Sequence, residues 1–157
     1  MIKIIAIGNL LMGDDSIGLR IIDAIEEKLK GLDLDIKCIK AETDFNYALD
    51  NIENGDFIFI LDSTLLGLEC GKITKIPIGE AKKYLDNLLS IHSISLISLI
   101  NHSNIEVKGF ILGIEVSKVE FSLDITKELE CQFEKICSEV YRIIKTNSLE
   151  YLKKGEN

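Results

Sequence analysis

Apolar residues alternate along the chain between short continuous runs and positions spaced by three or four. The first run, residues 2–7, is rich in isoleucine and ends at Gly8, which predicts a buried parallel strand. The spacing then becomes helical, with charged residues on the other face and Gly31 as the C-cap. The apolar face of this predicted helix consists of Ile17, Ile21, Ile22, Ile25 and Leu29.

The same alternation continues to the end of the chain. The further predicted strands are 34–39, 57–61, 72–76 and 110–116. The further predicted helices are 47–52, 81–89 and 129–144. Residues 91–100 fit either a strand, because many are β-branched, or a helix, because their apolar positions share one stripe.

This order of elements predicts an α/β fold. We expect a single-domain three-layer sandwich, in which a mostly parallel twisted sheet has helices on both faces. Residues 1–150 are expected to form the domain and residues 151–157 a charged C-terminal tail. Because ligands of such sheets bind outside the carboxyl ends of the strands, residues at those ends are the candidates for chemistry.

Composition narrows the class of partner. The chain has 157 residues, 46% of them apolar, and a net charge of -8, which argues against a nucleic-acid groove or an anionic membrane surface. The N-terminus lacks the features of a secretory signal, and no apolar run reaches the about 18 residues of a membrane span. We therefore expect a cytoplasmic protein without membrane insertion.

The four cysteines contain no C-x-x-C pair, so neither a zinc site nor a disulfide framework is indicated. We expect each thiol to be reduced and to serve as a small buried side chain. The residues are Cys38, Cys70, Cys131 and Cys137.

The loop between Gly8 and Gly18 contains an acidic pair, Asp14 and Asp15. The spacing from Gly8 to Gly13 imitates a phosphate-binding loop, but the acidic pair stands where that motif has Lys and Ser or Thr. Two carboxylates repel a triphosphate, so a cation is the better guest and no nucleotide is expected. The alternative is that the pair caps the following helix.

Asp62 and His92 are the other candidates. Asp62 directly follows an apolar strand, where a buried carboxylate needs a partner or a metal. The alternative is that Asp62 bonds only the turn at Ser63. His92 lies in an apolar stretch, where a structural role is common, but with Asp15 and Asp62 it gives a mixed O,O,N set suited to a borderline divalent metal. His102 is expected to be exposed and is assigned no role.

These features resemble the hydrogenase maturation endopeptidases. The stretch Gly8-Asn9-x-Leu11-x-x-Asp14-Asp15-x-x-Gly18 is similar to their N-terminal signature. Four further matches follow in order and extend the resemblance over nearly the whole chain: Asp62, the glycines 67 and 71, Ser-x-His at 90–92, and Leu-Gly-Ile-Glu at 112–115.

The resemblance implies an endopeptidase that removes the C-terminal extension of a nickel-loaded [NiFe]-hydrogenase large-subunit precursor. It assigns nickel recognition and catalysis to Asp15, Asp62 and His92, with the nickel supplied by the substrate. The enzyme is expected to be a monomer. The chain departs from the family where residues 40–44 replace a Gly-rich segment, which puts loops that require glycine in doubt.

Two alternatives come from other classes. A phospho-acceptor receiver domain also combines an acidic pair with an Asp after the third strand, but its pair directly ends the first strand and it has a Lys that closes a later strand. A non-catalytic protein that only recognises nickel-loaded subunits is the second alternative, favoured by the altered residues 40–44. Asp14 orients the loop or acts as a base, and spacing does not decide between these two roles.

Overall fold

A computed structural model of the chain describes residues 1–84 and 90–155 and shows a five-stranded sheet. The strand order is β2-β1-β3-β5-β4, and every neighbouring pair is parallel except β4 and β5. This arrangement confirms the predicted mostly parallel α/β sheet. The strands are β1 (Ile2–Ile7), β2 (Ile36–Glu42), β3 (Phe57–Thr64), β4 (Ile73–Pro77) and β5 (Lys108–Glu115).

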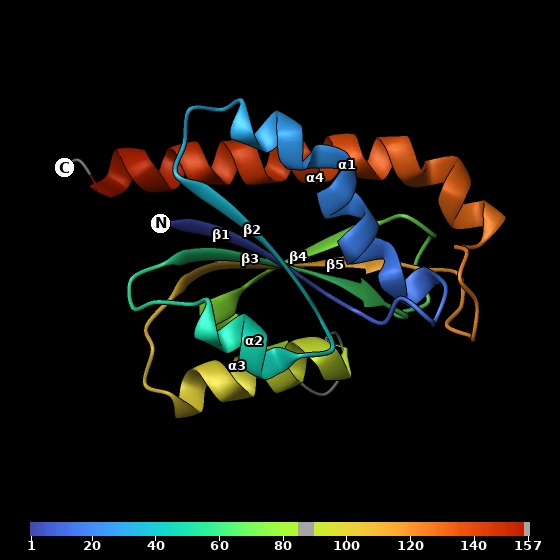
Figure 1. The fold of residues 1–157 in the computed structure, drawn as a ribbon, viewed down its shortest axis with the longest axis horizontal. Coiled ribbons are helices and arrows are strands. Elements are labelled where there is room, and N and C mark those ends of the chain that lie inside the picture. The colour runs from blue at the N-terminus through green and yellow to red at the C-terminus, as the bar shows by residue number, and fades with distance from the viewer. Residues whose placement is uncertain (85–89, 156–157) are drawn as a thin grey trace.

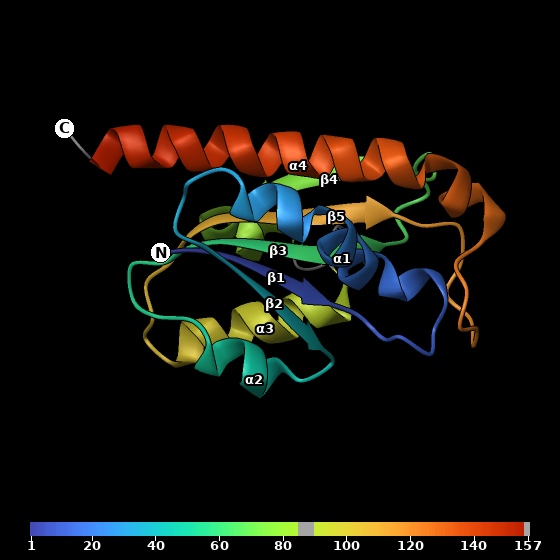
Figure 2. The same cartoon turned by 45° about the horizontal axis from the view of Figure 1, so that its top comes forward.

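Helices cover both faces of the sheet, which gives the predicted three layers. α1 and α4 lie on one face, and α2 and α3 lie on the other (Figures 1 and 2). The helices are α1 (Ile17–Lys30), α2 (Phe45–Asp50), α3 (Ile91–His102) and α4 (Lys127–Gly155), with short 3-10 helices η1 (Asp14–Ser16) and η2 (Ile78–Tyr84). Within the part of the chain that the structure describes, no helix has the length and hydropathy needed to cross a membrane.

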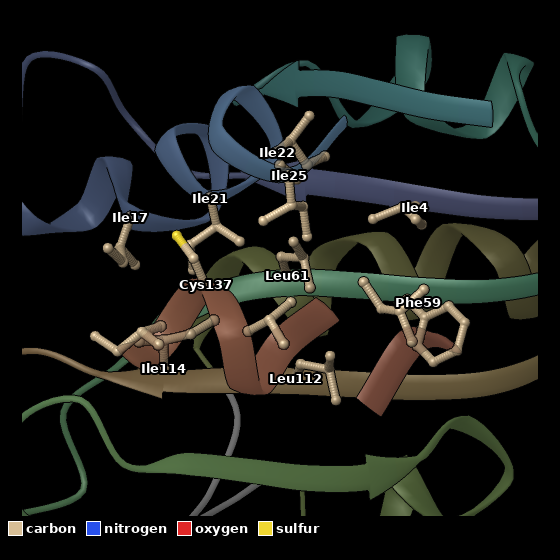
Figure 3. Packing of buried hydrophobic residues seen from close by; sticks show 14 of the residues in the cluster. Ile4, Ile17, Ile21, Ile22, Ile25, Phe59, Leu61, Leu112, Ile114 and Cys137 are labelled. Atoms are coloured by element: carbon tan, nitrogen blue, oxygen red, sulfur yellow. The ribbon is translucent and has the colours of Figure 1, made fainter. Parts of the chain in front are cut away.

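Side-chain alternation along the central strands divides the core in two. Every residue of β1 and β3 is buried, because both strands have neighbours on each side and helices above and below. Ile4 and Phe59 pack with α1 and α4, where Leu61, Leu112 and Ile114 join them (Figure 3). Ile5 and Ile60 point to the opposite face and pack with α2 and α3.

Several boundaries differ from the prediction. β3 continues to Thr64, so Asp62 lies inside the strand and not after it. Residues 91–100 are helical, because the Ser90 side chain caps α3 by accepting a bond from the backbone N–H of Ser93. The predicted helix 81–89 is a 3-10 helix as far as Tyr84, and its remainder lies outside the described residues.

The expected boundary between residues 150 and 151 falls within α4. The helix continues to Gly155 because its last turns still have a partner: the ring of Tyr151 stacks on Phe57, with centroids 4.2 Å apart. Lys153 and Lys154 therefore belong to the end of α4 and not to a separate tail.

Candidate metal centre

Three side chains from different elements meet at the carboxyl end of the sheet. Asp15 comes from η1, Asp62 from β3 and His92 from the first turn of α3. His92 Nδ1 lies 3.8 Å from Asp15 Oδ1 and 3.6 Å from Asp62 Oδ1. One ligand atom from each residue lies within 4.8 Å of the others. The structure thus brings together all three residues that the sequence nominated.

Asp15 is fixed by two hydrogen bonds. Its Oδ2 accepts from the backbone N–H of Asn9 at 2.8 Å, and its Oδ1 accepts from the Ser63 hydroxyl at 2.6 Å. Gly8 makes this approach possible: its φ is +143°, and a Cβ there would lie 2.1 Å from the backbone oxygen of Asp15. Position 8 must therefore be glycine for Asp15 to take its place in the site.

The last glycine of the motif has a different role. A Cβ on Gly18 would lie 2.7 Å from the carbonyl oxygen of Leu61. Because Gly18 has no side chain, α1 approaches β3 closely at Leu61, the residue before Asp62. This contact sets the distance between β3, which carries Asp62, and the helix that directly follows Asp15 and η1.

Asp62 is almost completely buried, with 1% exposure, and its carboxylate holds the start of α3. Its Oδ2 accepts from the Ser90 hydroxyl, and from the backbone N–H and hydroxyl of Ser93 at 3.1 and 2.6 Å. Its Oδ1 also accepts from the backbone N–H of Ser63 at 2.9 Å. A bond to the local turn accounts only for the contact with Ser63. The alternative that Asp62 bonds only this turn is therefore wrong.

His92 is half-buried beside the Phe45 ring, at 6.1 Å between centroids. Its Nδ1 is buried and has no hydrogen-bond partner among the described residues. The Asp62 carboxylate raises the pKa of His92 above its ordinary value; burial opposes this shift, and Asp15 adds to it. Buried polar atoms are rarely left without a partner, so the unpartnered nitrogen points to a missing ligand.

Asp14 does not contribute to this group, nor does it cap a helix. The N-caps of η1 and α1 are Gly13 and Ser16, with no side-chain capping bond at either, so the capping alternative is wrong for both aspartates. The buried Asp14 carboxylate instead accepts bonds from residues far along the chain. The donors are the backbone N–H groups of Ser117, Lys118 and Thr126 and the hydroxyl of Thr126.

The sequence did not single out Ser63, Ser93 or the capping role of Ser90, although they position the metal candidates. Ser63 directly follows Asp62, and Ser90 and Ser93 flank His92, so hydroxyl groups beside the candidate ligands were the available signal. Glu115 belongs to the Leu-Gly-Ile-Glu match but was given no role: its buried carboxylate accepts from the Thr64 hydroxyl and from the backbone N–H groups of Leu66 and Leu68, in the loop after β3.

Two other expectations are tested at residues outside this group. Cys131 is exposed, which contradicts the expected burial, because it lies on the solvent side of α4.

In the segment 40–44, Glu42 adopts a positive φ of 52° without being glycine. Asp44 caps α2 through the backbone N–H of Tyr47 at 2.9 Å. Although residues 40–44 lack the glycines of the family's segment, they therefore still contain a residue in the left-handed conformation.

The distances from His92 to the two carboxylates fit a small divalent ion. Two N or O ligands at about 2.1 Å from one ion lie about 3.0 to 4.2 Å apart for angles between 90° and 180°. The distances of 3.6 and 3.8 Å from His92 Nδ1 to the carboxylates fall within this range. Two carboxylates and one imidazole leave coordination positions open for a second molecule.

Comparisons with known proteins give one family match and several similar solved structures. Residues 19–143 match the family model described as hydrogenase maturation protease (HycI). The chain is similar to the solved structure of the maturating endopeptidase HybD of E. coli, with 20% identity, a TM-score of 0.75 and 93% of each chain covered. It is also similar to the [NiFe] hydrogenase maturation protease HybD of Thermococcus kodakarensis, with 20% identity and a TM-score of 0.73 over 91% of this chain and 98% of the other. A search of curated protein sequences gave no match.

Proposed function

This chain belongs to the hydrogenase maturation protease family and is therefore a peptidase, and we propose that its substrate is a nickel-loaded precursor of a [NiFe]-hydrogenase large subunit. In this proposal the enzyme removes the C-terminal extension of the precursor. Asp15, Asp62 and His92 bind the nickel ion that the precursor carries. The family membership also removes the support for a receiver domain.

The observation that carries the proposal is the unpartnered Nδ1 of His92. This nitrogen is buried, and two carboxylate oxygens lie 3.6 and 3.8 Å from it. A neutral imidazole and two carboxylates are a ligand set that a borderline metal such as Ni²⁺ accepts. Serine hydroxyls hold both carboxylates in place before any metal arrives, so the set is preorganised.

Nickel that bridges the precursor and this group places the scissile peptide at the carboxyl end of the sheet. A metal ion in this position polarises a peptide carbonyl or activates a bound water. Asp15, Asp62 and His92 complete its coordination from the enzyme side. Substrate recognition and catalysis then depend on the same three side chains.

A thiol mechanism has little support. Burial raises the pKa of Cys38 and of Cys137 to about 11. About one such thiol in 10⁴ is ionised at neutral pH, and the thiolate is the nucleophilic form. Burial also raises the pKa of Cys70, while Cys131 is exposed on α4, which covers one face of the sheet. These positions favour the metal group as the reactive site.

The test is cleavage of a purified nickel-loaded precursor, followed by intact-mass spectrometry. The wild-type enzyme should shorten this precursor and leave a nickel-free precursor intact. Asp15→Ala, Asp62→Ala and His92→Ala should each reduce the rate by about 10²-fold or more, since each removes a metal ligand. His102→Ala is the matched control, because His102 is exposed and its ring contacts the Ser98 carbonyl, away from the metal group.

Three outcomes would contradict the proposal in different ways. Equal cleavage of nickel-loaded and nickel-free precursor would remove nickel recognition. Full activity of all three alanine variants would move the site elsewhere. Tight binding of the loaded precursor without cleavage would identify a recognition protein in place of a protease.

A further inference from the structure

Two loops at the carboxyl end of the sheet pair with each other and form one raised edge. We call this edge the apolar lip and define it as residues 9–13 and 117–125. The backbone N–H of Gly13 donates to the Ser122 carbonyl at 2.8 Å, and the N–H of Ser122 donates to the Leu11 carbonyl at 3.0 Å. The two loops lie beside each other at the end of the molecule where β1, β3 and β5 terminate (Figures 1 and 2).

Large apolar side chains on the lip point into solvent. Single exposed apolar residues are common, but five on two paired loops form a surface that needs an explanation. Phe121 is 78% exposed and Leu123 is 66% exposed, among the most exposed apolar side chains of the described residues. The other members are Leu10, Leu11 and Val119.

The lip is held in place from beneath. The Asp14 carboxylate accepts four hydrogen bonds from Ser117 and Lys118 of the lip and from Thr126, with distances of 2.6 to 3.4 Å. Arg20 donates to the Leu123 carbonyl at 2.6 Å and to the Ser16 hydroxyl at 2.8 Å. The buried Asp14 carboxylate and the partly exposed Arg20 thus fix the backbone of a segment whose apolar side chains are left uncovered. Such preorganisation reduces the entropy cost of binding a partner.

We propose that the apolar lip binds an apolar surface of the large-subunit precursor next to its nickel, with Asp14 as the residue that positions the lip. This inference rests on the proposed function. The lip joins the metal group directly, because Asp14, which holds the lip, and Asp15, a metal candidate, are consecutive in η1. A molecule whose nickel contacts Asp15 is therefore bound beside the segment that Asp14 holds at Ser117 and Thr126.

A second copy of this chain is a poorer occupant. In a two-fold dimer the same surface meets itself, so the acidic groups of one copy face those of the other. Each chain carries a net charge of -8. On the lip itself Lys118 pairs with Glu120 at 2.7 Å, so Asp124 leaves the lip with a net negative charge. Asp15 and Asp62 would add to this repulsion, whereas a precursor brings a cation to them.

The test compares Phe121→Ser and Leu123→Ser with the wild-type enzyme on the nickel-loaded precursor. Both side chains are largely exposed, so neither change should unfold the protein. We expect the dissociation constant for the precursor and the KM for its cleavage to rise about tenfold or more in each variant. Affinity for free Ni²⁺ should be unchanged, because no metal ligand is altered. Leu149→Ser on α4 is the matched control and should leave every value unchanged.

Unchanged precursor affinity in both lip variants, with cleavage by the wild type, would overturn the lip proposal and leave the proposed function standing. A wild-type dimer that Phe121→Ser converts to a monomer, measured by light scattering, would also overturn it and assign the lip to a second copy. A wild-type protein that neither binds nor cleaves the loaded precursor would overturn the proposed function and the lip proposal together.

Discussion

His92 Nδ1 and Asp62 Oδ1 lie 3.6 Å apart, close enough for the carboxylate to raise the pKa of the imidazole. A proton on His92 and a metal ion compete for the same nitrogen, because only the neutral ring binds a metal. The raised pKa means that the protonated form persists to a higher pH than the ordinary value of 6.5 allows. Metal binding should therefore weaken before an ordinary histidine would be protonated.

Calorimetric titration with Ni²⁺ between pH 8 and pH 6 measures this competition. We expect the apparent affinity to fall as the pH is lowered, approaching a tenfold loss per pH unit below the raised pKa. His92→Ala should bind more weakly and should show a flatter pH profile. A wild-type affinity that stays constant over this range would contradict the role of His92.

Ser93→Ala tests the support of Asp62. The change removes a 2.6 Å hydrogen bond from a buried hydroxyl to the carboxylate. We expect a loss of about 1–2 kcal/mol in the free energy of unfolding and about 10- to 100-fold in Ni²⁺ affinity. Urea denaturation and calorimetry measure the two effects. Ser98→Ala, on the exposed side of the same helix, should change neither.

Asp14→Ala tests the attachment of the lip. Loss of this carboxylate leaves the backbone N–H groups of Ser117, Lys118 and Thr126 without their acceptor. We expect a loss of about 2–3 kcal/mol in the free energy of unfolding. Amide hydrogen exchange should become faster in residues 117–126. If the exposed Asp124→Ala variant loses as much, the effect does not come from these bonds.

Glu42→Gly tests the backbone of the segment that replaces the family's Gly-rich one. Glu42 is exposed with a φ of 52°, where a side chain costs about 1–2 kcal/mol and glycine costs little. Glycine also gains about 0.4–1 kcal/mol of unfolded-state entropy, which opposes folding. We expect a net stabilisation of about 0.5–1 kcal/mol by urea denaturation. Glu42→Ala keeps the Cβ and should show no gain.

The periodicity of the sequence was sufficient to predict the layered fold. The isoleucine-rich run 2–7 matches the buried strand β1, and the helical spacing of Ile17 to Leu29 matches α1. The edges of elements were less predictable. β3 gains Asp62, Ser63 and Thr64 because β5 pairs with them, and no local pattern reports that partner. The sequence left residues 91–100 ambiguous between a strand and a helix. The helix starts at bonds from Ser90 and Ser93 to Asp62, which is distant in the sequence.

The metal candidates were predictable because Asp15, Asp62 and His92 all lie at the carboxyl end of the sheet, where topology brings side chains together. A loop-orienting role was one of the two alternatives for Asp14, but the residues that it holds were not predictable. Its partners lie more than 100 positions away along the chain, and sequence spacing carries no information about that contact. An acidic residue before a helix is a frequent cap, so the local explanation was attractive and wrong.

The 3-10 turn Asp14–Ser16 places two consecutive carboxylates in two different structures. One holds the apolar lip, and its neighbour, about 3.8 Å away along the backbone, faces His92. A displacement of the lip therefore cannot leave the geometry of the metal ligands untouched. In the proposed binding mode, this turn requires the enzyme to recognise the precursor surface and the nickel ion of the precursor together. Neither free nickel nor an empty precursor satisfies both halves of that requirement.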